Sequence, residues 1–202
     1  MKKSLFLATL SVLAVGALFS IPAYGDRLAG PVEFKIMGGA SLARSTKPIG
    51  GSYGATAVSK YGLGIISGAG IEFPLTKLLS FEIDVIFLQK TCRIYRLSIE
   101  GVLYGRRVEK LNEISMPFFY KLYLRRGTSP FILMGGEFAF VLPRDPKWFD
   151  DGLVFGLGFR KKAQGGSLSI EGRYHHGLQD TQTERSILRK MRTFALVAGF
   201  SF

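Results

Sequence analysis

The stretch "LNEISMPFFYKLYLRR", residues 111–126, alternates between apolar and polar side chains. From Ile114 to Leu124 every even position is apolar, whereas the odd positions nearby include Glu113 and Lys121. A period of two places consecutive side chains on opposite faces of a β-strand. The stretch therefore predicts a strand with one apolar face and one polar face.

The same period recurs along the chain and predicts eight strands. Besides residues 111–125, the candidates are residues 32–36, 61–73, 80–87, 129–142, 152–161, 167–178 and 191–202. Eight strands are enough to close a barrel. We therefore expect an all-β fold, an eight-stranded antiparallel up-and-down transmembrane β-barrel.

The connections between these strands alternate in length. The short ones are residues 74–78, 125–129 and 162–166, and the long ones are residues 44–60, a segment around 98–107, and residues 143–151 and 180–190. Short turns at one end and long loops at the other are typical of outer-membrane barrels. Alternation continues through the second long connection, with Glu100-Gly101 as a tight turn, which predicts an extended hairpin that rises past the membrane.

The N-terminus has the pattern of an export signal. Lys2 and Lys3 precede a long apolar run that ends at Ile21, and small residues follow at the spacing for cleavage. We expect a signal peptide over residues 1–25 and a barrel domain over residues 26–202, located in the cell outer membrane.

The chain is strongly basic, with 27 Lys and Arg against 15 Asp and Glu and a net charge of +12. Removing Lys2 and Lys3 with the signal leaves 25 against 15, or about +10. This balance favours anionic partners. Export and the lack of a nucleic-acid-binding signature argue against nucleic acid, so outer-membrane lipid is the better candidate.

The polar strand faces mix acids and bases, which raises the question of which face lies inside. Buried charges persist only when they are paired and hydrogen-bonded, so a closed lumen could hold such a network, although a solvated outer face would also mix signs. A soluble lipocalin-like carrier, with its apolar face inside, would show the same alternation. Glycines at 62, 64, 68 and 70 share the polar face and favour a crowded lumen. Lys90 belongs to that face, and the predicted lumen charge network consists of Glu33, Lys35, Glu72, Glu82, Asp84, Glu113, Lys121, Glu137, Arg160, Glu171 and Arg173.

The chain ends "RTFALVAGFSF", with apolar residues on one face and an aromatic last residue. This ending resembles the C-terminal signal of bacterial outer-membrane barrels, except that the glycine stands at Gly199. It predicts Phe200 and Phe202 as the assembly signal that the barrel assembly machinery reads.

Four segments together resemble the PorT-like outer-membrane β-barrel family (outer membrane protein beta-barrel domain). They are "EISMPFFYKLYL", "SPFILMGGEFAFVL", "DGLVFGLGF" and "SIEGRYHHGLQD". The resemblance implies an eight-stranded barrel in a Gram-negative outer membrane with both termini in the periplasm. It does not imply an activity.

The adjacent His175 and His176 raise the possibility of an active site. Outer-membrane lipid A deacylases place a serine two residues after the histidine, where both side chains share a face. Here those positions hold Gly177 and Leu178, and alternation sends His175 into the lumen and His176 to the lipid side. We expect no catalytic residue, no cofactor and no metal, because these histidines and the lone Cys92 cannot converge. A lipid A-modifying enzyme remains the rival function.

Basic residues gather in the predicted long loops, where guanidinium groups would match the phosphates of lipopolysaccharide. Arg44, Lys47 and Lys60 bracket the first loop. A solvated rim that keeps the loops out of the membrane is the alternative role. The possible lipopolysaccharide contacts are Arg93, Arg96, Arg106, Arg107, Lys110, Arg185, Arg189 and Lys190. The sequence thus favours a non-enzymatic barrel that contacts lipopolysaccharide or an unknown surface or secretion-machinery protein.

Overall fold

The computed structural model describes residues 30–49, 56–97, 103–125, 129–142, 149–178, 180–183 and 186–202. The expected signal peptide, residues 1–25, lies outside these ranges. The strands are β1 (Glu33–Ile49), β2 (Thr56–Pro74), β3 (Leu79–Leu97), β4 (Leu103–Tyr123), β5 (Ser129–Leu142), β6 (Phe149–Ala163), β7 (Gly166–Gly177), β8 (Asp180–Thr183) and β9 (Ser186–Ser201).

The strands form one closed antiparallel ring. Neighbours in sequence pair from β1 to β7, β9 pairs with β7, and β1 closes the ring against β9. The four-residue β8 pairs with the start of β9 and lies beyond the end of β7. The predicted eight-stranded up-and-down barrel is therefore confirmed, with β8 as a short addition.

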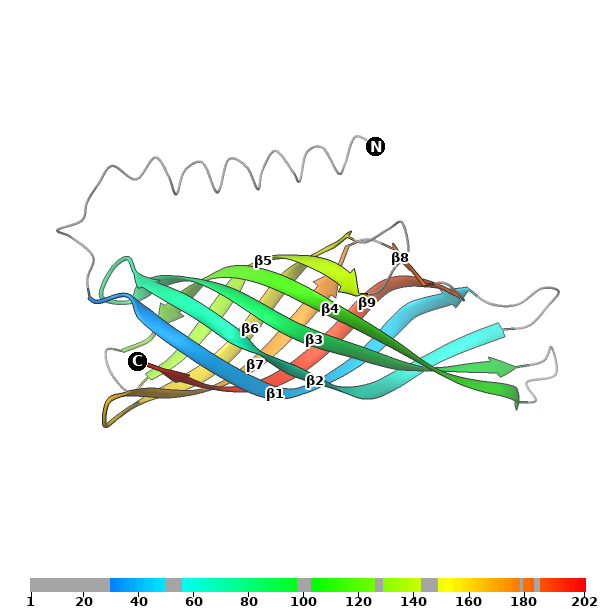
Figure 1. Cartoon of the computed structure of the whole chain (residues 1–202), viewed down its shortest axis with the longest axis horizontal. Helices are drawn as coiled ribbons and strands as arrows, with labels where there is room; N and C mark the ends of the chain where they lie inside the picture. Colours follow the sequence, from blue (N-terminus) through cyan, green and yellow to red (C-terminus); the bar gives the residue numbers. More distant parts are fainter. Residues whose placement is uncertain are drawn as a thin grey trace, which may run out of the picture.

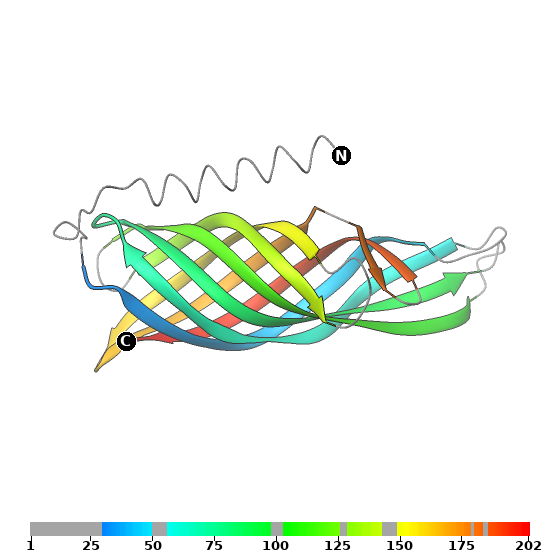
Figure 2. The same ribbon diagram turned by 45° about the horizontal axis from the view of Figure 1, so that its top comes forward.

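The two ends of the barrel differ. The last residues of β2, β4 and β6 lie at one end together with the C-terminus, and we call this the short-turn end (Figure 1). At the opposite end β3 and β4 project past most of the other strands, and we call this the long-strand end. All strands slant around the barrel axis (Figure 2), as closure of a sheet into a barrel requires.

At the long-strand end, several strand boundaries differ from those expected. Residues 44–49 continue β1, and residues 56–60 begin β2, where a loop over 44–60 was expected. Where a loop over 180–190 was expected, residues 180–183 form β8 and residues 186–190 begin β9, and the two strands pair with each other. The reason is that backbone pairing with a neighbour continues past the point where the face alternation becomes irregular, as at Lys47 opposite Arg189. The predicted continuation of β3 and β4 as a paired extension is observed up to Leu97 opposite Leu103, and the expected turn at Glu100-Gly101 lies outside the described residues.

The structure places apolar side chains outside and charged ones inside. On β4, Ile114, Met116 and Tyr120 are exposed on the outer surface, whereas Glu113 and Lys121 are buried in the lumen. The apolar outer residues form a band around the barrel that includes Ile36, Leu63, Val85, Met134, Leu157, Ile170 and Leu196. Alternation and closure together therefore produce a barrel with an apolar outside and a polar interior.

The seam between β1 and β9 depends on close backbone approach. A Cβ atom at Gly39 would run into the carbonyl oxygen of Leu196 on β9, whereas one at the neighbouring Gly38 would meet nothing closer than 3.9 Å. The C-terminal residue completes this seam, since the Phe202 amide donates to the Phe34 carbonyl at 2.8 Å and the Phe34 amide donates to the Phe202 carbonyl at 3.0 Å. The last residue thus takes part in closing the ring.

We predict that Gly39→Ala destabilises the barrel by about 1–3 kcal/mol because β1 must shift away from β9. Gly38→Ala is the matched control, since its methyl group has room, and should unfold at nearly the wild-type urea concentration. The measurement is urea unfolding of the refolded barrel in detergent micelles. Equal unfolding midpoints for the two variants would contradict the close seam.

Candidate functional site

A cluster of six charges, the central cluster, occupies the middle of the lumen. It contains three cations and three carboxylates from four strands: Lys35 of β1, Glu82 and Asp84 of β3, Lys121 of β4, and Glu171 and Arg173 of β7. All six side chains are at most 2% exposed. Buried charges are stable only with such partners, and the numbers of positive and negative groups are equal.

Arg173 joins the carboxylates of the central cluster. Its guanidinium lies 2.6 Å from Glu171 Oε2, 2.7 Å from Asp84 Oδ2 and 3.5 Å from Glu82 Oε1. It also stacks over the ring of Phe119, 4.8 Å from the centroid. Since Gly70 has no Cβ, there is room beside it for the Asp84 carboxylate. A planar donor with several N–H groups suits this site better than a lysine would.

The lysines bridge the other pairs of the central cluster. Lys35 Nζ lies 2.6 Å from Glu171 Oε1 and 2.9 Å from Glu82 Oε1. Lys121 Nζ pairs with Glu82 and lies 3.1 Å from Glu171 Oε1. Each carboxylate of Glu82 and Glu171 thus contacts both lysines, which ties β1, β3, β4 and β7 together across the barrel interior.

A second group of charges, the acidic cluster, lies nearer the long-strand end and contains more carboxylates than cations. Lys90 Nζ lies 2.6 Å from Glu113 Oε2 and 3.3 Å from Asp150 Oδ2. Beside them, His175 Nδ1 lies 2.7 Å from Glu137 Oε2. Three carboxylates therefore face one lysine and one histidine, and Glu113 Oε1, Asp150 Oδ1 and His175 Nε2 are buried without a hydrogen-bond partner among the described residues.

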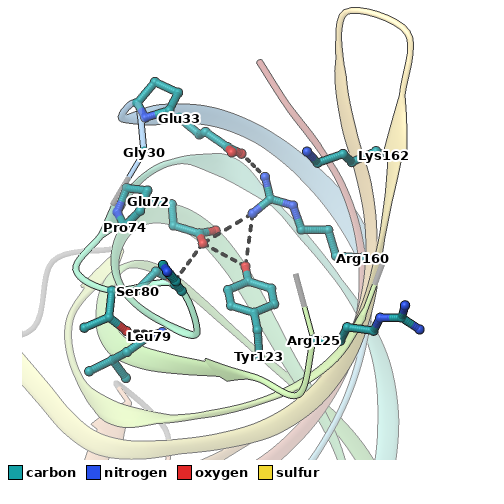
Figure 3. Close-up of a pocket in the computed structure, with 13 residues that line it drawn as sticks. Gly30, Glu33, Glu72, Pro74, Leu79, Ser80, Tyr123, Arg125, Arg160 and Lys162 are labelled. Carbon is teal, nitrogen blue, oxygen red and sulfur yellow. Dashed lines mark hydrogen bonds and ion pairs between the residues drawn. The ribbon is translucent and has the colours of Figure 1, made fainter. Parts of the chain in front are cut away.

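A third group closes the lumen at the short-turn end (Figure 3). Arg160 forms an ion pair with Glu33, lies 3.4 Å from Glu72 Oε1, and donates to the Tyr123 hydroxyl at 3.2 Å. The Tyr123 and Ser80 hydroxyls donate to Glu72 Oε1 at 2.7 Å and 2.6 Å. Glu72 Oε2 lies 3.6 Å from Lys121 Nζ, which connects this group to the central cluster.

Apolar side chains fill the lumen around these charges. One cluster contains Met37, Ile66, Ile86 and Leu88, and another contains Phe119, Phe131, Leu133 and Val154. The narrow interior of an eight-stranded barrel is normally filled by side chains in this way. The arrangement is that of a packed interior and differs from the wide aqueous channel of larger barrels.

The structure brings all eleven predicted lumen residues to the interior, and it adds residues that the pattern did not identify. Asp150 was expected in a loop, but it faces the lumen as the second residue of β6. Tyr123 stands at an odd position of residues 111–125, on the polar face, so the alternation could have placed its side chain in the lumen. Its bond to Glu72, 51 positions away in sequence, had no sequence signal.

The two histidines lie on opposite faces. His175 is buried in the lumen, whereas His176 is only partly buried, and its Nδ1 lies 3.2 Å from the Tyr174 hydroxyl. In the lumen, Ser115 donates to the same Glu137 oxygen that His175 contacts, at 3.0 Å. The carboxylate therefore lies between the serine and the histidine, whereas a hydrolytic triad requires the histidine between the serine and the acid.

Within the described segments no three His, Cys, Asp or Glu side chains are grouped so that they could hold a metal ion. Nor does any described segment form a helix long and apolar enough to span a membrane.

Basic residues and tyrosines form a patch on the outer surface toward the long-strand end. We define this outer patch as Lys60 of β2, Arg93 and Tyr95 of β3, and Arg106 and Lys110 of β4. Lys60 Nζ lies 5.1 Å and the Arg106 guanidinium 6.0 Å from the Tyr95 ring centroid. Lys60 pairs in register with Arg93, and Tyr95 with Arg106. All four cations are exposed, which leaves them accessible to an anion.

The other predicted loop cations lie elsewhere. Arg107 forms an ion pair with Glu109, and Lys190 is exposed at a residue of β9 with a φ of 34°. Arg185 and the side chains of Arg96 and Arg189 lie outside what the structure describes. Both residues of the predicted assembly signal are on β9 or just after it, and the Phe200 and Phe202 rings stack at 6.2 Å.

No family model and no curated protein matches the chain. Among solved structures, the outer membrane protein OprG from Pseudomonas aeruginosa is similar at 10% identity and a TM-score of 0.47, over 84% of this chain and 95% of OprG. Ail, the attachment invasion locus protein of Yersinia pestis, is similar at 15% identity and a TM-score of 0.45, over 86% of this chain and 100% of Ail. The assignment of a closed barrel rests on the strand pairing of the chain itself.

We predict that Arg173→Met lowers the free energy of unfolding by about 3–5 kcal/mol, because three buried carboxylates would then face two lysines. Adding Asp84→Asn restores equal numbers of charges and should recover part of the loss. Urea unfolding of Arg173→Met, Asp84→Asn and the double variant in detergent micelles measures this. If the loss in free energy of unfolding for the double variant equals the sum of the losses for the two single variants, Arg173 and Asp84 are not coupled.

Proposed function

We propose that the protein is a non-enzymatic integral barrel of the bacterial outer membrane that binds lipopolysaccharide phosphates through its outer patch. The short-turn end then faces the periplasm and the long-strand end the cell exterior, as short periplasmic turns and longer extracellular segments are the rule in such barrels.

The apolar band supports membrane insertion. On β4 the outer face is apolar from Ile114 to Leu124, a length of eleven residues, and a tilted strand crosses a bilayer with about 9–11 residues. The band ends at Asn112, whose Oδ1 accepts a hydrogen bond from Gln89 Nε2 at 3.1 Å. A soluble lipocalin-like carrier would need its apolar face inside, where this chain has its charges.

The position and charge of the outer patch support binding of lipopolysaccharide. On β4, Lys110 and Arg106 follow Asn112 on the same outer face, directly beyond the apolar band. Side chains at that level meet lipid headgroups, and the headgroup region of lipopolysaccharide carries phosphates. Guanidinium groups bind phosphate through two parallel N–H bonds, and exposed cations over a tyrosine ring are held in place for such contacts.

The assembly and family assignments are further parts of this proposal. The aromatic end at Phe200 and Phe202 supports recognition by the barrel assembly machinery. The four strand segments named above support a PorT-like relationship, in which an extracellular or secretion-machinery protein would be a further partner. The expected export signal over residues 1–25 supports delivery to the envelope.

We predict that Arg93→Gln combined with Arg106→Gln weakens binding of lipid A to the purified barrel about tenfold, because two phosphate contacts are lost. Native mass spectrometry of the barrel in detergent, titrated with bisphosphorylated lipid A, measures the bound fraction.

Two controls accompany this titration. Lys161→Gln removes an exposed charge at the other end of the barrel and should leave binding unchanged. Dephosphorylated lipid A should bind both proteins equally weakly. The outer patch is not a phosphate site if the double variant binds bisphosphorylated lipid A as the wild type does.

The rival function, modification of lipid A, has its own test. We expect a strain that carries His175→Ala and His176→Ala to show the same lipid A acylation pattern by mass spectrometry as the wild-type strain, because among the described residues no serine hydrogen-bonds to either histidine. A matched strain that lacks the protein provides the reference. If a lipid A modification of the wild-type strain is missing from both the histidine variant strain and the strain that lacks the protein, the non-enzymatic role is refuted.

A further inference from the structure

A cavity of about 370 Å³ lies at the short-turn end, inside the mouth of the barrel. Its floor is formed by the group of Glu33, Glu72, Tyr123 and Arg160, which converge within the ring of strands (Figure 3). Its volume falls within the range of about 300–1,000 Å³ that is typical of small-ligand sites. None of the functions considered above uses this cavity.

The wall and rim of the cavity carry cations from each of the three short-turn regions. Lys77 comes from the turn between β2 and β3, Arg125 follows β4, and Lys162 lies near the end of β6. All three are exposed, and within the described part of the chain none forms an ion pair. Three separate cations without partners around one cavity favour a ligand with several negative charges.

The floor beneath these cations holds two carboxylates and one guanidinium, which already contact one another. Glu33 and Glu72 pair with Arg160, and Glu72 also accepts from Ser80 and Tyr123. Among the described residues that line the cavity, the charges without an ion-pair partner are therefore the three cations of the wall and rim. A ligand would place its negative groups at Lys77, Arg125 and Lys162 and its neutral part in the cavity.

We propose that this cavity binds an acidic peptide segment of a periplasmic protein. Glu33, Glu72, Tyr123 and Arg160 converge inside the strand ring, so a ligand that reaches them enters along the barrel axis, whereas the phospholipids of a surrounding membrane lie against the outer surface. A peptide with several carboxylates can reach cations on three turns and still bury part of its backbone in the cavity. The periplasmic origin of the peptide rests on the proposed membrane orientation, but binding itself does not.

The test uses the full mature barrel in phosphatidylcholine nanodiscs and a fluorescein-labelled penta-glutamate peptide, with fluorescence anisotropy as the readout. The wild type should bind this peptide and should not bind penta-lysine. Lys77→Gln, Arg125→Gln and Lys162→Gln together should weaken binding about tenfold, since each exposed charge contributes modestly. Added salt should weaken the wild-type interaction.

Four further variants separate a cavity site from diffuse attraction. Lys162→Gln should weaken binding, whereas its neighbour Lys161→Gln, which does not line the cavity, should not. Leu79→Trp narrows the cavity without changing charge and should abolish binding. Glu33→Gln removes one of the two carboxylates that contact Arg160 and should strengthen binding of the peptide. Heat-modifiable electrophoretic mobility verifies that each variant is folded.

The proposal is overturned if penta-glutamate does not bind, or if Lys161→Gln and Lys162→Gln weaken binding equally. It is also overturned if phosphatidylglycerol in the nanodisc displaces the peptide from the wild type, because the cations would then serve phospholipid headgroups. The lipid A titration of the outer patch is a separate measurement on the other end of the barrel, so the two proposals can fail independently.

Discussion

Charges that point into a closed, narrow barrel must find partners there, and this constraint shapes the whole molecule. Lys35, Lys121 and Arg173 meet three carboxylates in the central cluster, where the side chains are almost fully buried. Removing one partner would leave an uncompensated buried charge, which is far more costly than the pair itself is stabilising. The central cluster therefore holds β1, β3, β4 and β7 in one register, and the apolar outer face follows from the same alternation.

The two ends of the barrel extend this common interior in different ways. At the long-strand end, β2, β3 and β4 continue past the apolar band and carry the exposed cations and Tyr95 of the outer patch. At the short-turn end, the ion pairs of Arg160 close the lumen and leave a cavity with a cationic rim. Both ends therefore present exposed cations, whereas the central cluster pairs its own charges.

The acidic cluster shows that side-chain direction, more than proximity in sequence, decides which residues contact one another. His175 and His176 are adjacent and resemble a reactive pair in sequence, yet the strand sends one to the lumen and the other to the outer surface. His175 instead contacts Glu137, 38 residues away, which also accepts from Ser115. A serine, a histidine and an acid are close together here, but in an order that does not activate the serine.

The sequence alone determined the barrel class, the grouping of the predicted lumen residues on one strand face and the positions of the short turns, because all of these follow from a period of two and from local turn composition. Only the tertiary structure decided which charges pair, since Lys35 and Glu171 are 136 residues apart and meet through closure of the ring. It also decided the strand ends beyond the apolar band, where pairing with neighbours replaces alternation. The outer patch and the cavity likewise required the closed ring, which brings separate strands and turns to the same surface.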